Sequence, residues 1–550
     1  MVRVHVGFAQ EQGLSSLSKT SSHSLFGGPH SIQAEKCRRE AKLTCRTICR
    51  DYCNNTAVHG FRYFFEKGRS VQERTFWVFG VFLCFTVSLY LISKVWTKWE
   101  TCPVIVTFAD QPTPVWSVPF PAVTICPSTK TKPALFNYTL AQHHVLDNVS
   151  TEEEFWKYQA LSLICIPQAM PPNYHLNATA NDFLVEVAPT MEEVILECYW
   201  QHRQLNCSKH FMRTLTEEGV CFTFNGLSPH EIYTNETQES LRGPSEFPSS
   251  GWSVDGGYDD GDATIKRYYP RRQQFVGADT GFRVILQSAD ADMDYVCKGC
   301  EQGFRVYLHS PAHAPSWTRH YSALPLNTSM YLLASPALMT TTDGLKDYSP
   351  ERRSCYFPTE RKLRYYRYYS MESCIYECFT NMTQRRCGCA PIGLPMSAVP
   401  PGVPMCSIFS QCNLKTYVEL LDEAEKVPFD GPIPQECHCL PSCKTLHYHG
   451  EATSFDFPWN MERIARRMPS TPQGLSRSQL NVYFDTLQFV TSQRRELYGH
   501  TDFLANTGGL LGLFTGFSVI SLVELFYYVS LRLWCDVKRR AEERRRRDGN

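Results

Sequence analysis

The amino-acid sequence predicts an α+β membrane protein in which two transmembrane helices flank a large, disulfide-rich extracellular domain. Three observations lead to this prediction: two long apolar runs, many cysteines between them, and several short segments with strand-like patterns. The chain has 550 residues, more than one hydrophobic core usually supports, so we expect several subdomains. Lys plus Arg and Asp plus Glu each number 55, and this balance argues against a nucleic-acid-binding protein.

Two segments are long and apolar enough to cross a bilayer. The first predicted span, residues 75–96, contains the charge-free run TFWVFGVFLCFTVSLYLIS. The second, residues 503–531, holds 29 residues and is interrupted only by Glu524. A core helix of a soluble protein is the weaker alternative for both. Because a span needs about 20 residues and 29 would form a helix of about 44 Å, the second segment must tilt strongly or break.

The basic residues predict that both ends of the chain are cytosolic. Residues 36–74 carry ten lysines and arginines, and the tail at 532–550 is also strongly basic. The positive-inside rule therefore places residues 1–74 and 532–550 in the cytosol and residues 97–502 outside the cell. The first 70 residues show no cleavable signal peptide, so we expect the first span to act as an uncleaved signal-anchor in the plasma membrane.

The cysteines and glycosylation sequons agree with this topology. Of the 24 cysteines, 18 lie between residues 97 and 502, where an oxidising environment would pair them. Seven Asn-x-Ser/Thr sequons lie in the same region. The predicted glycosylation sites are Asn137, Asn148, Asn177, Asn206, Asn235, Asn327 and Asn381.

The extracellular region is predicted to contain much β-structure. Residues 120–126, 221–225, 281–288 and 303–310 alternate or run apolar, with β-branched and aromatic side chains. Residues 243–262 are rich in Gly, Ser and Asp, and we expect a solvated loop there. The aspartate spacing does not fit an EF-hand, so no metal site is predicted.

Cysteine spacing predicts a local disulfide arrangement between residues 355 and 443. Cys374 and Cys378 lie on one face of a helix predicted over 370–386, about 6 Å apart along its axis. Cys437 and Cys439 would share a strand face, about 6.6 Å apart. The matching distances allow two disulfides to join the helix to an extended segment. A zinc site built from the C-x-C pairs is the weaker alternative, because this spacing is unusual for zinc and extracellular thiols oxidise.

The second span has features that a simple anchor does not need. Gly508, Gly512 and Gly516 repeat every four residues, with Gly509 beside them, and such a stripe lets helices approach closely. Helix packing in a dimer is the alternative explanation of the stripe. At Gly516-Phe517-Ser518 the helix can open and present carbonyls to a dehydrated cation.

Glu524 is the second feature of this span. It costs about 2.5–3.5 kcal/mol in a bilayer unless it faces water or a partner, so we predict that it lines an aqueous vestibule. One helix cannot enclose a pore, so the protein is expected to be an oligomer. No enzyme motif is found: GxSxG, HExxH and phosphate-loop patterns are missing, so we expect neither catalysis nor a cofactor.

The motifs resemble those of the degenerin/epithelial sodium channel superfamily, and within it the insect pickpocket branch. In order, they are HG at 59–60, then FPAVTICP, TEEGVCFTFN, GFRVYLHSP, CGC, CHCLPSC and GGLLGLFTGFS, over about residues 55 to 530. The resemblance implies a homo- or heterotrimer whose second spans line a sodium-selective, amiloride-sensitive cation pore. It also implies gating by an extracellular ligand or by force, Na⁺ as the permeant ion, and an extracellular fold of palm, knuckle, β-ball, finger and thumb.

The resemblance further implies roles for particular residues. Gly516, Phe517 and Ser518 match the selectivity filter, and Ala505 matches the position where bulky side chains hold degenerin channels open. His59 and Gly60 match the N-terminal gating motif. The implied disulfides are Cys126–Cys221, Cys198–Cys207, Cys355–Cys443, Cys374–Cys439, Cys378–Cys437, Cys387–Cys412 and Cys389–Cys406.

Four extracellular cysteines remain, and we expect them to pair as Cys102–Cys165 and Cys297–Cys300. The chain also departs from the acid-sensing members, many of which carry tryptophan where this chain has Arg352, so proton gating is not implied. Two other classes share the topology. A two-span cysteine-rich receptor without conductance would not need the glycine stripe, and an ATP-gated channel would need a basic cluster that does not stand out.

Overall fold

The computed structural model describes residues 47–66, 68–101, 104–165, 176, 179–234, 249–259, 261, 268–314, 320–391, 403–406, 410–425, 437–469, 474–497 and 499–548. The chain divides into two compact units. One, here called the helical unit, comprises Met1–Thr101 and Tyr498–Asn550, and the other, the sheet unit, is Cys102–Leu497. The division falls a few residues from the boundaries expected at 97 and 502.

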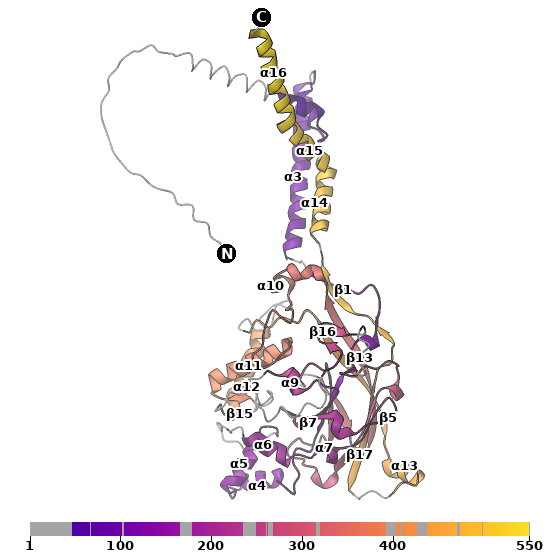
Figure 1. Ribbon diagram of the computed structural model, residues 1–550. Coiled ribbons are helices and arrows are strands. Elements are labelled where there is room, and N and C mark those ends of the chain that lie inside the picture. The colour runs from indigo at the N-terminus through magenta and orange to yellow at the C-terminus, as the bar shows by residue number, and fades with distance from the viewer. Residues whose placement is uncertain are drawn as a thin grey trace, which may run out of the picture. The chain divides into compact units, whose positions relative to one another are not determined.

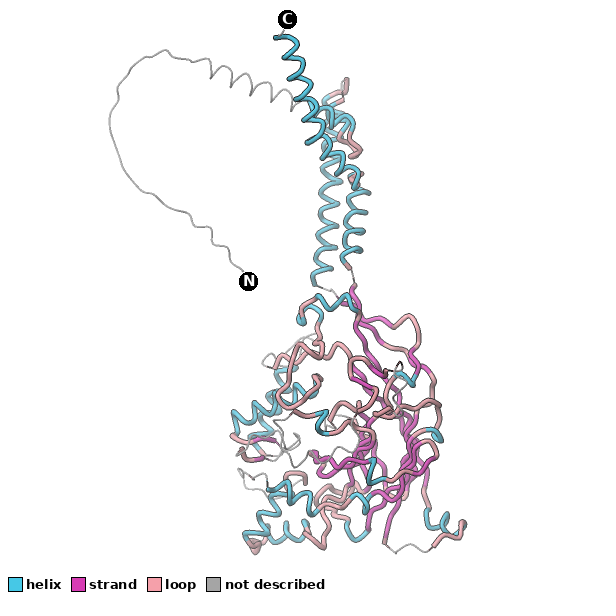
Figure 2. The backbone as a smooth tube through the Cα atoms, in the orientation of Figure 1, coloured by secondary structure: helices cyan, strands magenta, loops and turns pink. Residues whose placement is uncertain are grey.

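Two helices run side by side in the helical unit, α3 (Val71–Thr101) and α14 (His500–Thr515) (Figures 1 and 2). At one end their aromatic rings meet: the Phe503 ring lies 5.7 Å from that of Trp96 and 5.4 Å from that of Trp99. Most side chains of α3 are exposed, including Phe76 at 70%. Within the described residues, α3 is the one unbroken helix long and apolar enough to cross a membrane.

The second apolar run breaks instead of forming one tilted helix. After α14 come α15 (Val519–Tyr527), a π-helical turn η7 (Tyr528–Arg532) and α16 (Leu533–Asp548). The helical segments before and after the break differ in direction by 70°. The described part of the unit also contains two shorter helical stretches, residues 47–55 and α2 (Arg62–Phe65).

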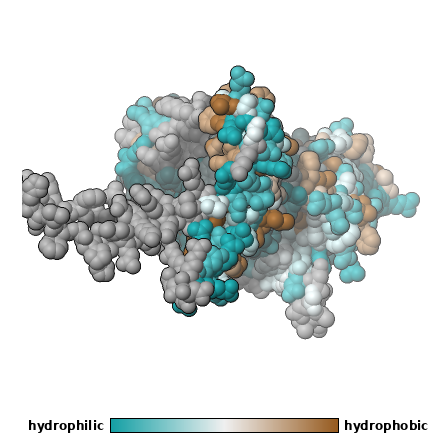
Figure 3. All heavy atoms as spheres, turned by 90° about the horizontal axis from the view of Figure 1, so that it is seen from above, coloured by the Kyte–Doolittle hydropathy of each residue, from teal (hydrophilic) through white to brown (hydrophobic). Residues whose placement is uncertain are grey.

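Contacts of η7 join the second apolar run to the helical stretch 47–55. Arg532 pairs with Asp51 at 3.4 Å, and the rings of Tyr52 and Tyr528 meet edge to face with centroids 5.4 Å apart. In the view of Figure 3, hydrophilic side chains surround smaller groups of hydrophobic ones.

Two β-sheets form the centre of the sheet unit. The larger sheet has the strand order β1-β19-β13-β17-β10-β4-β5, with β16 paired to β13. Its strands are β1 (Val104–Phe108), β4 (Ile195–Trp200), β5 (Arg203–Gln204), β10 (Phe282–Ala289), β13 (Thr328–Thr341), β16 (Thr445–Asp456), β17 (Leu475–Tyr483) and β19 (Ser492–Glu496). The pairs of β13 with β17 and β19 are parallel, and the others are antiparallel.

The smaller sheet is antiparallel and has the order β12-β11-β3-β7-β6. Its strands are β3 (Ala122–Pro127), β6 (Phe211–Thr216), β7 (Gly219–Phe224), β11 (Gly303–His309) and β12 (Ser322–Pro325). Within the described residues, three short strand pairs are also present: β2 (Thr113–Pro114) with β18 (Gln488–Phe489), β8 (Trp252–Ser253) with β9 (Gly257–Tyr258), and β14 (Ala390–Pro391) with β15 (Met405–Cys406). The β8–β9 hairpin lies in the segment that we expected to be a loop.

All four predicted strands are confirmed, as β3, β7, β10 and β11. Every residue of β3 and β7 is buried, which explains why these segments read as continuous apolar runs and do not alternate. The two sheets share one core. Phe224 of β7 stacks on Phe282 of β10 with ring centroids 4.0 Å apart, and Phe120 meets Trp200 at 4.8 Å.

Helices gather in two groups beside the sheets (Figure 1). The first contains α4 (Tyr138–Leu146), α5 (Glu152–Leu161) and α6 (Thr179–Val187), and the second contains α11 (Met371–Cys387) and α12 (Gln411–Glu425). The shorter helical elements are η1 (Val115–Ser117), α7 (Met191–Val194), α8 (Cys207–His210), α9 (Pro229–Ile232), η3 (Ala278–Thr280), η4 (Asp290–Asp292), η5 (Asp343–Asp347), α10 (Pro350–Arg353) and α13 (Trp459–Ala465).

The ends of α11 explain why the helix predicted over 370–386 forms. Ser370 caps its N-terminus by accepting a hydrogen bond from the Ser373 N–H, and Gly388 ends it in the left-handed region at φ 69°.

Eight disulfides form among the described residues of the sheet unit, and they include all seven that the resemblance implied. The eighth joins Cys165 to Cys297, so the expected pairs Cys102–Cys165 and Cys297–Cys300 are both wrong. The folded core brings Cys165, at the end of α5, against a loop 132 residues later, and no local spacing reveals this contact. Cys300 is free and exposed, and Cys102 lies outside the described residues.

The segment that receives the two disulfides from α11 differs from the expected strand. Cys374 bonds Cys439 and Cys378 bonds Cys437, but these partners lie in a turn and loop. Between them His438 adopts φ 47°, in the left-handed region, so the two cysteines do not share a strand face.

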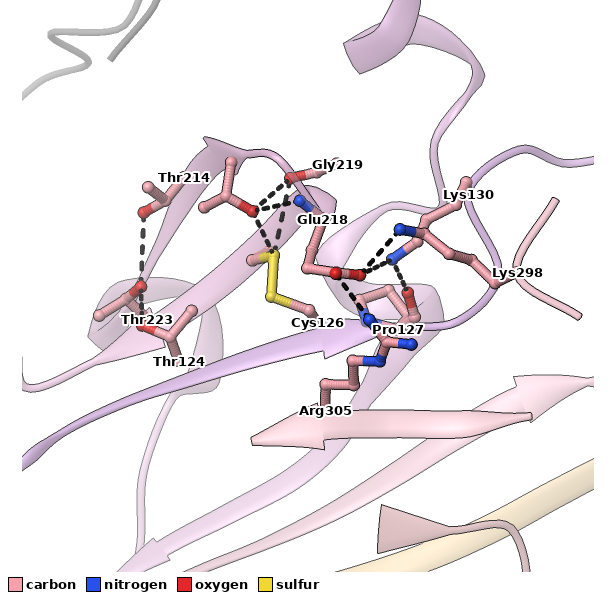
Figure 4. Close-up of a disulfide and its surroundings, with 12 residues drawn as sticks. Thr124, Cys126, Pro127, Lys130, Thr214, Glu218, Gly219, Thr223, Lys298 and Arg305 are labelled. Atoms are coloured by element: carbon pink, nitrogen blue, oxygen red, sulfur yellow. Dashed lines mark hydrogen bonds and ion pairs between the residues drawn. A yellow bond between two sulfur atoms is a disulfide. The ribbon is translucent and has the colours of Figure 1, made fainter. Parts of the chain in front are cut away.

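A cluster of buried charges lies beside the Cys126–Cys221 disulfide (Figure 4). Glu218, in the turn between β6 and β7, pairs with Lys298 at 3.1 Å, Lys130 at 3.6 Å and Arg305 at 2.6 Å. Burial opposes ionisation of Glu218, but the positive charges of these three side chains outweigh it and lower its pKa to about 2. The cluster is therefore a buried carboxylate held by three cations.

The neighbouring Glu217 is in the opposite electrostatic situation. Its side chain is buried and bonds Tyr376 of α11, and burial raises its pKa to about 8 despite the hydrogen bonds that favour the charged form. Because the folded pKa exceeds the unfolded value of 4.5, the stabilisation by Glu217 is fully present below pH 4.5 and is lost as the pH rises through about 8.

We therefore expect Glu217→Gln to flatten the fall in stability between about pH 5 and pH 8, the interval between the unfolded and folded pKa values. One proton corresponds to at most about 1.4 kcal/mol per pH unit. The melting temperature of the purified full chain should be measured for both proteins at several pH values. Lys130, whose pKa burial lowers to about 7, acts in the opposite direction but is present in both proteins. If the melting temperatures of the two proteins changed with pH in parallel, the raised pKa of Glu217 would be contradicted.

Candidate functional site

The break in the second apolar run is a three-residue segment with defined geometry. Gly516 ends α14 with φ +67°, a conformation that favours glycine, and its N–H donates to the Gly512 carbonyl at 2.9 Å. Ser518 begins α15, and its hydroxyl accepts from the Ser521 N–H at 3.3 Å. Gly516, Phe517 and Ser518 thus lie between two separately capped helices, as the predicted opening requires.

A segment from the N-terminal part of the chain packs against this break. The His59 N–H donates to the Thr515 carbonyl at 2.9 Å, which satisfies a group that the end of α14 would leave unpaired. The His59 ring lies so close to Gly516 that a Cβ added there would stand 2.8 Å from two ring atoms. Gly60 is also confined: it has φ +85°, and a Cβ would lie 2.4 Å from Val81 of α3.

Glu524 contacts the same N-terminal segment. Its side chain is half-buried on α15, and one carboxylate oxygen accepts from the Ala57 N–H at 3.3 Å. The break and α15 therefore hold residues 57–60 at two points, Thr515 and Glu524. We had predicted a water-lined vestibule for Glu524; the structure adds a backbone partner within the chain.

Other predicted residues of this run lie on open faces of α14. Ala505, Gly508 and Gly509 are exposed, and a Cβ added at either glycine would meet nothing within 4 Å. A Cβ at Gly512 would approach only the Phe517 carbonyl, at 3.8 Å. The described chain therefore offers this glycine stripe no partner helix.

An apolar cavity of about 890 Å³ lies next to the break. It is lined by residues 58–61 and 64, by α3 and by the end of α14, and many of the lining side chains are aromatic. Tyr63 stacks on Trp77 of α3 with ring centroids 4.3 Å apart, which places the N-terminal segment against this helix. Sequence reasoning missed the contacts of the N-terminal segment. It also missed the start of α15 at Ser518, which the Ser-x-x-Ser spacing of Ser518 and Ser521 could have indicated.

The predicted glycosylation sites occupy several environments. Asn148, Asn206 and Asn327 are exposed, Asn137 caps the N-terminus of α4, and Asn381 is half-buried within α11. Asn177 and Asn235 lie outside the described residues. Within the part of the chain that the structure describes, no group of three or more His, Cys, Asp or Glu side chains is placed to hold a metal ion.

Comparisons with known proteins identify relatives along most of the chain. Residues 52–528 match the family described as "Amiloride-sensitive sodium channel". Pickpocket protein 28 of Drosophila melanogaster is 27% identical, over 90% of this chain and 80% of its own length. Sodium channel protein Nach of the same organism is 20% identical, over 90% and 89%. Acid-sensing ion channel 1C of Danio rerio is 21% identical, over 87% and 82%.

Two of these relatives, Nach and acid-sensing ion channel 1C, are named as channels. The family match includes the first apolar run, the sheet unit and most of the second apolar run. The resemblance found from the motifs is confirmed. The chain belongs to the amiloride-sensitive sodium channel family, within the degenerin/epithelial sodium channel superfamily.

Proposed function

We propose that this chain is one subunit of a trimeric, sodium-selective and amiloride-sensitive cation channel of the plasma membrane. The observation that carries the proposal is the break at Gly516–Ser518, a left-handed glycine held between two capped helices by His59. In this proposal residues 97–502 form the palm, knuckle, β-ball, finger and thumb outside the cell. Both ends of the chain lie in the cytosol, and α3 and the broken second run are the two spans.

The break would form the selectivity filter. Because Gly516, Phe517 and Ser518 lie outside regular helix, their backbone groups are open to replace the water around a sodium ion. Three copies of α14 would meet through the open stripe of Gly508, Gly509 and Gly512, which has no partner helix among the residues that the structure describes.

The residues around the filter would act as the gate. Ala505, eleven residues before Gly516, would lie at the gate between α14 helices. His59 and Gly60 would report movement of the N-terminal segment to the filter, since His59 contacts Thr515 and Gly516 and Gly60 lies next to it against Val81 of α3. The stimulus would be an extracellular ligand or mechanical force.

A two-span receptor without conductance is the second candidate. Its exposed cysteine-rich region would serve equally well for binding a ligand. The left-handed break favours the channel, because an anchor helix has no need to interrupt its backbone hydrogen bonds in the bilayer.

Ser518→Cys tests the proposed filter. We expect a changed sodium/potassium permeability ratio, or block of current by a thiol reagent applied from outside, because position 518 would line the ion path. Currents should be recorded from cells that express the chain alone and with related subunits. Ser530→Cys is the matched control, since Ser530 lies in η7, beyond α15, and external reagent should not reach it. Normal selectivity together with insensitivity at position 518 would count against the filter assignment.

A further inference from the structure

The loop before β11 places a free thiol three residues from a disulfide. Its sequence is Cys297-Lys298-Gly299-Cys300. Cys297 is buried and bonds Cys165, whereas Cys300 is free and exposed. Among the described residues, the free cysteines Cys53, Cys84 and Cys535 belong to the helical unit.

We propose that this loop is a thiol–disulfide exchange site, in which Cys300 attacks Cys297 and displaces Cys165. The Cys300 thiolate forms a new sulfur–sulfur bond with Cys297 as the Cys165–Cys297 bond breaks. Cys165 leaves as the thiolate and takes up the proton that Cys300 lost. One disulfide replaces another, so the step needs no external oxidant or reductant.

The chain between the two cysteines is short and adaptable enough for this bond. A disulfide needs Cα atoms within about 4.4–6.8 Å, and a four-residue turn brings its ends within about 7 Å. Gly299 already has φ +68°, with no atom within 4 Å of an added Cβ, so the turn has room to tighten. Exchange therefore requires a local rearrangement of a loop whose nucleophile is already at the surface.

Neighbouring contacts would keep the loop in place during exchange. The Cys297 N–H donates to Asp294 at 3.0 Å, and Lys298 pairs with Glu218 at 3.1 Å. Asp294 also accepts from the Thr139 hydroxyl of α4 at 3.0 Å. These contacts fix Cys297 and Lys298, so in this proposal Cys300 is the part of the loop that moves.

The consequence of exchange is the release of a long-range covalent link. The Cys165–Cys297 bond spans 132 residues and fastens the end of α5 to the loop before β11. A Cys297–Cys300 bond would close only a local turn. The group α4, α5 and α6 would then be held to the sheets by noncovalent packing alone, and Cys165 would become available to thiol reagents.

The test is disulfide mapping of the full chain, purified in detergent without reductant. Samples are incubated at pH 6 and pH 8.5, quenched with acid, alkylated with N-ethylmaleimide, digested and analysed by mass spectrometry. We expect alkylated Cys165 and the Cys297–Cys300 peptide to accumulate together, faster at pH 8.5, because the thiolate is the nucleophile. Cys198–Cys207 serves as the internal control and should stay intact.

Cys300→Ser is the decisive variant, because it removes the nucleophile and keeps the native bond. It should show at least tenfold less alkylation of Cys165 than the wild type. Equal alkylation in both proteins would overturn the proposal, as would a Cys300 already bonded to Cys102 or to a second chain. Cys165→Ser should shift the loop to the Cys297–Cys300 bond, and if it fails to fold the comparison with Cys300→Ser still decides. None of these readouts depends on ion conduction.

Discussion

Gly516→Ala should abolish most of the channel current while the protein still reaches the cell surface. Gly516 has φ +67°, which costs an alanine about 1–2 kcal/mol, a factor of roughly 5–30 in an equilibrium. The new Cβ would also stand 2.8 Å from the ring of His59, a residue whose backbone N–H is bonded to the Thr515 carbonyl. We expect at least a tenfold loss of current, measured together with surface biotinylation.

Two further variants separate the causes of this loss. Gly80→Ala is the matched control, because Gly80 lies within α3 and an added Cβ meets nothing within 4 Å. It should leave the current near the wild-type level. His59→Ala combined with Gly516→Ala removes the collision but not the backbone strain, so partial recovery is expected. Wild-type current from Gly516→Ala alone would show that the break does not need its left-handed glycine.

Glu218→Gln should destabilise the sheet unit by about 3–5 kcal/mol and sharply reduce the amount of protein at the cell surface. The side chain of Glu218 is 13% exposed and neutralises Lys298, Lys130 and Arg305. A neutral amide would leave these three cations near one another, with only the exposed Glu301 carboxylate still paired to Arg305. Surface labelling and the melting temperature of purified protein measure the effect.

Glu301→Gln is the matched control for this substitution. Glu301 pairs with the same Arg305 at 3.0 Å, but its side chain is 71% exposed, and exposed pairs contribute little. It should change stability by less than about 1 kcal/mol. Equal effects of the two substitutions would show that burial of the carboxylate is not what matters.

The ion pairs of Glu218 also predict how the stability of the protein changes at acidic pH. The folded pKa of Glu218, about 2, lies below the ordinary value of 4.5, so its stabilisation is present above pH 4.5 and is lost as the pH falls through about 2. Acid unfolding of the wild type should therefore be steeper than that of Glu218→Gln. Superimposable acid-unfolding curves of the two proteins would contradict the lowered pKa of Glu218.

Local patterns in the sequence were sufficient for much of the fold. The charge-free run at 75–93 predicted α3, and apolar runs predicted β3, β7, β10 and β11, because side-chain periodicity and length act over a few neighbouring residues. The spacing of Cys374 and Cys378 predicted two disulfides from one helix face. Excess length also predicted that the second run would tilt or break.

The tertiary structure alone decided which distant groups meet. Cys165 pairs with Cys297, His59 packs on Gly516, and Glu218 is buried among three cations, although no spacing in the sequence indicates any of these contacts. The physical reason is that such contacts depend on how whole sheets and helices pack, and packing sums weak interactions over many residues. Local pattern therefore determined the elements, and packing determined the partners that give the break and the exchange site their chemistry.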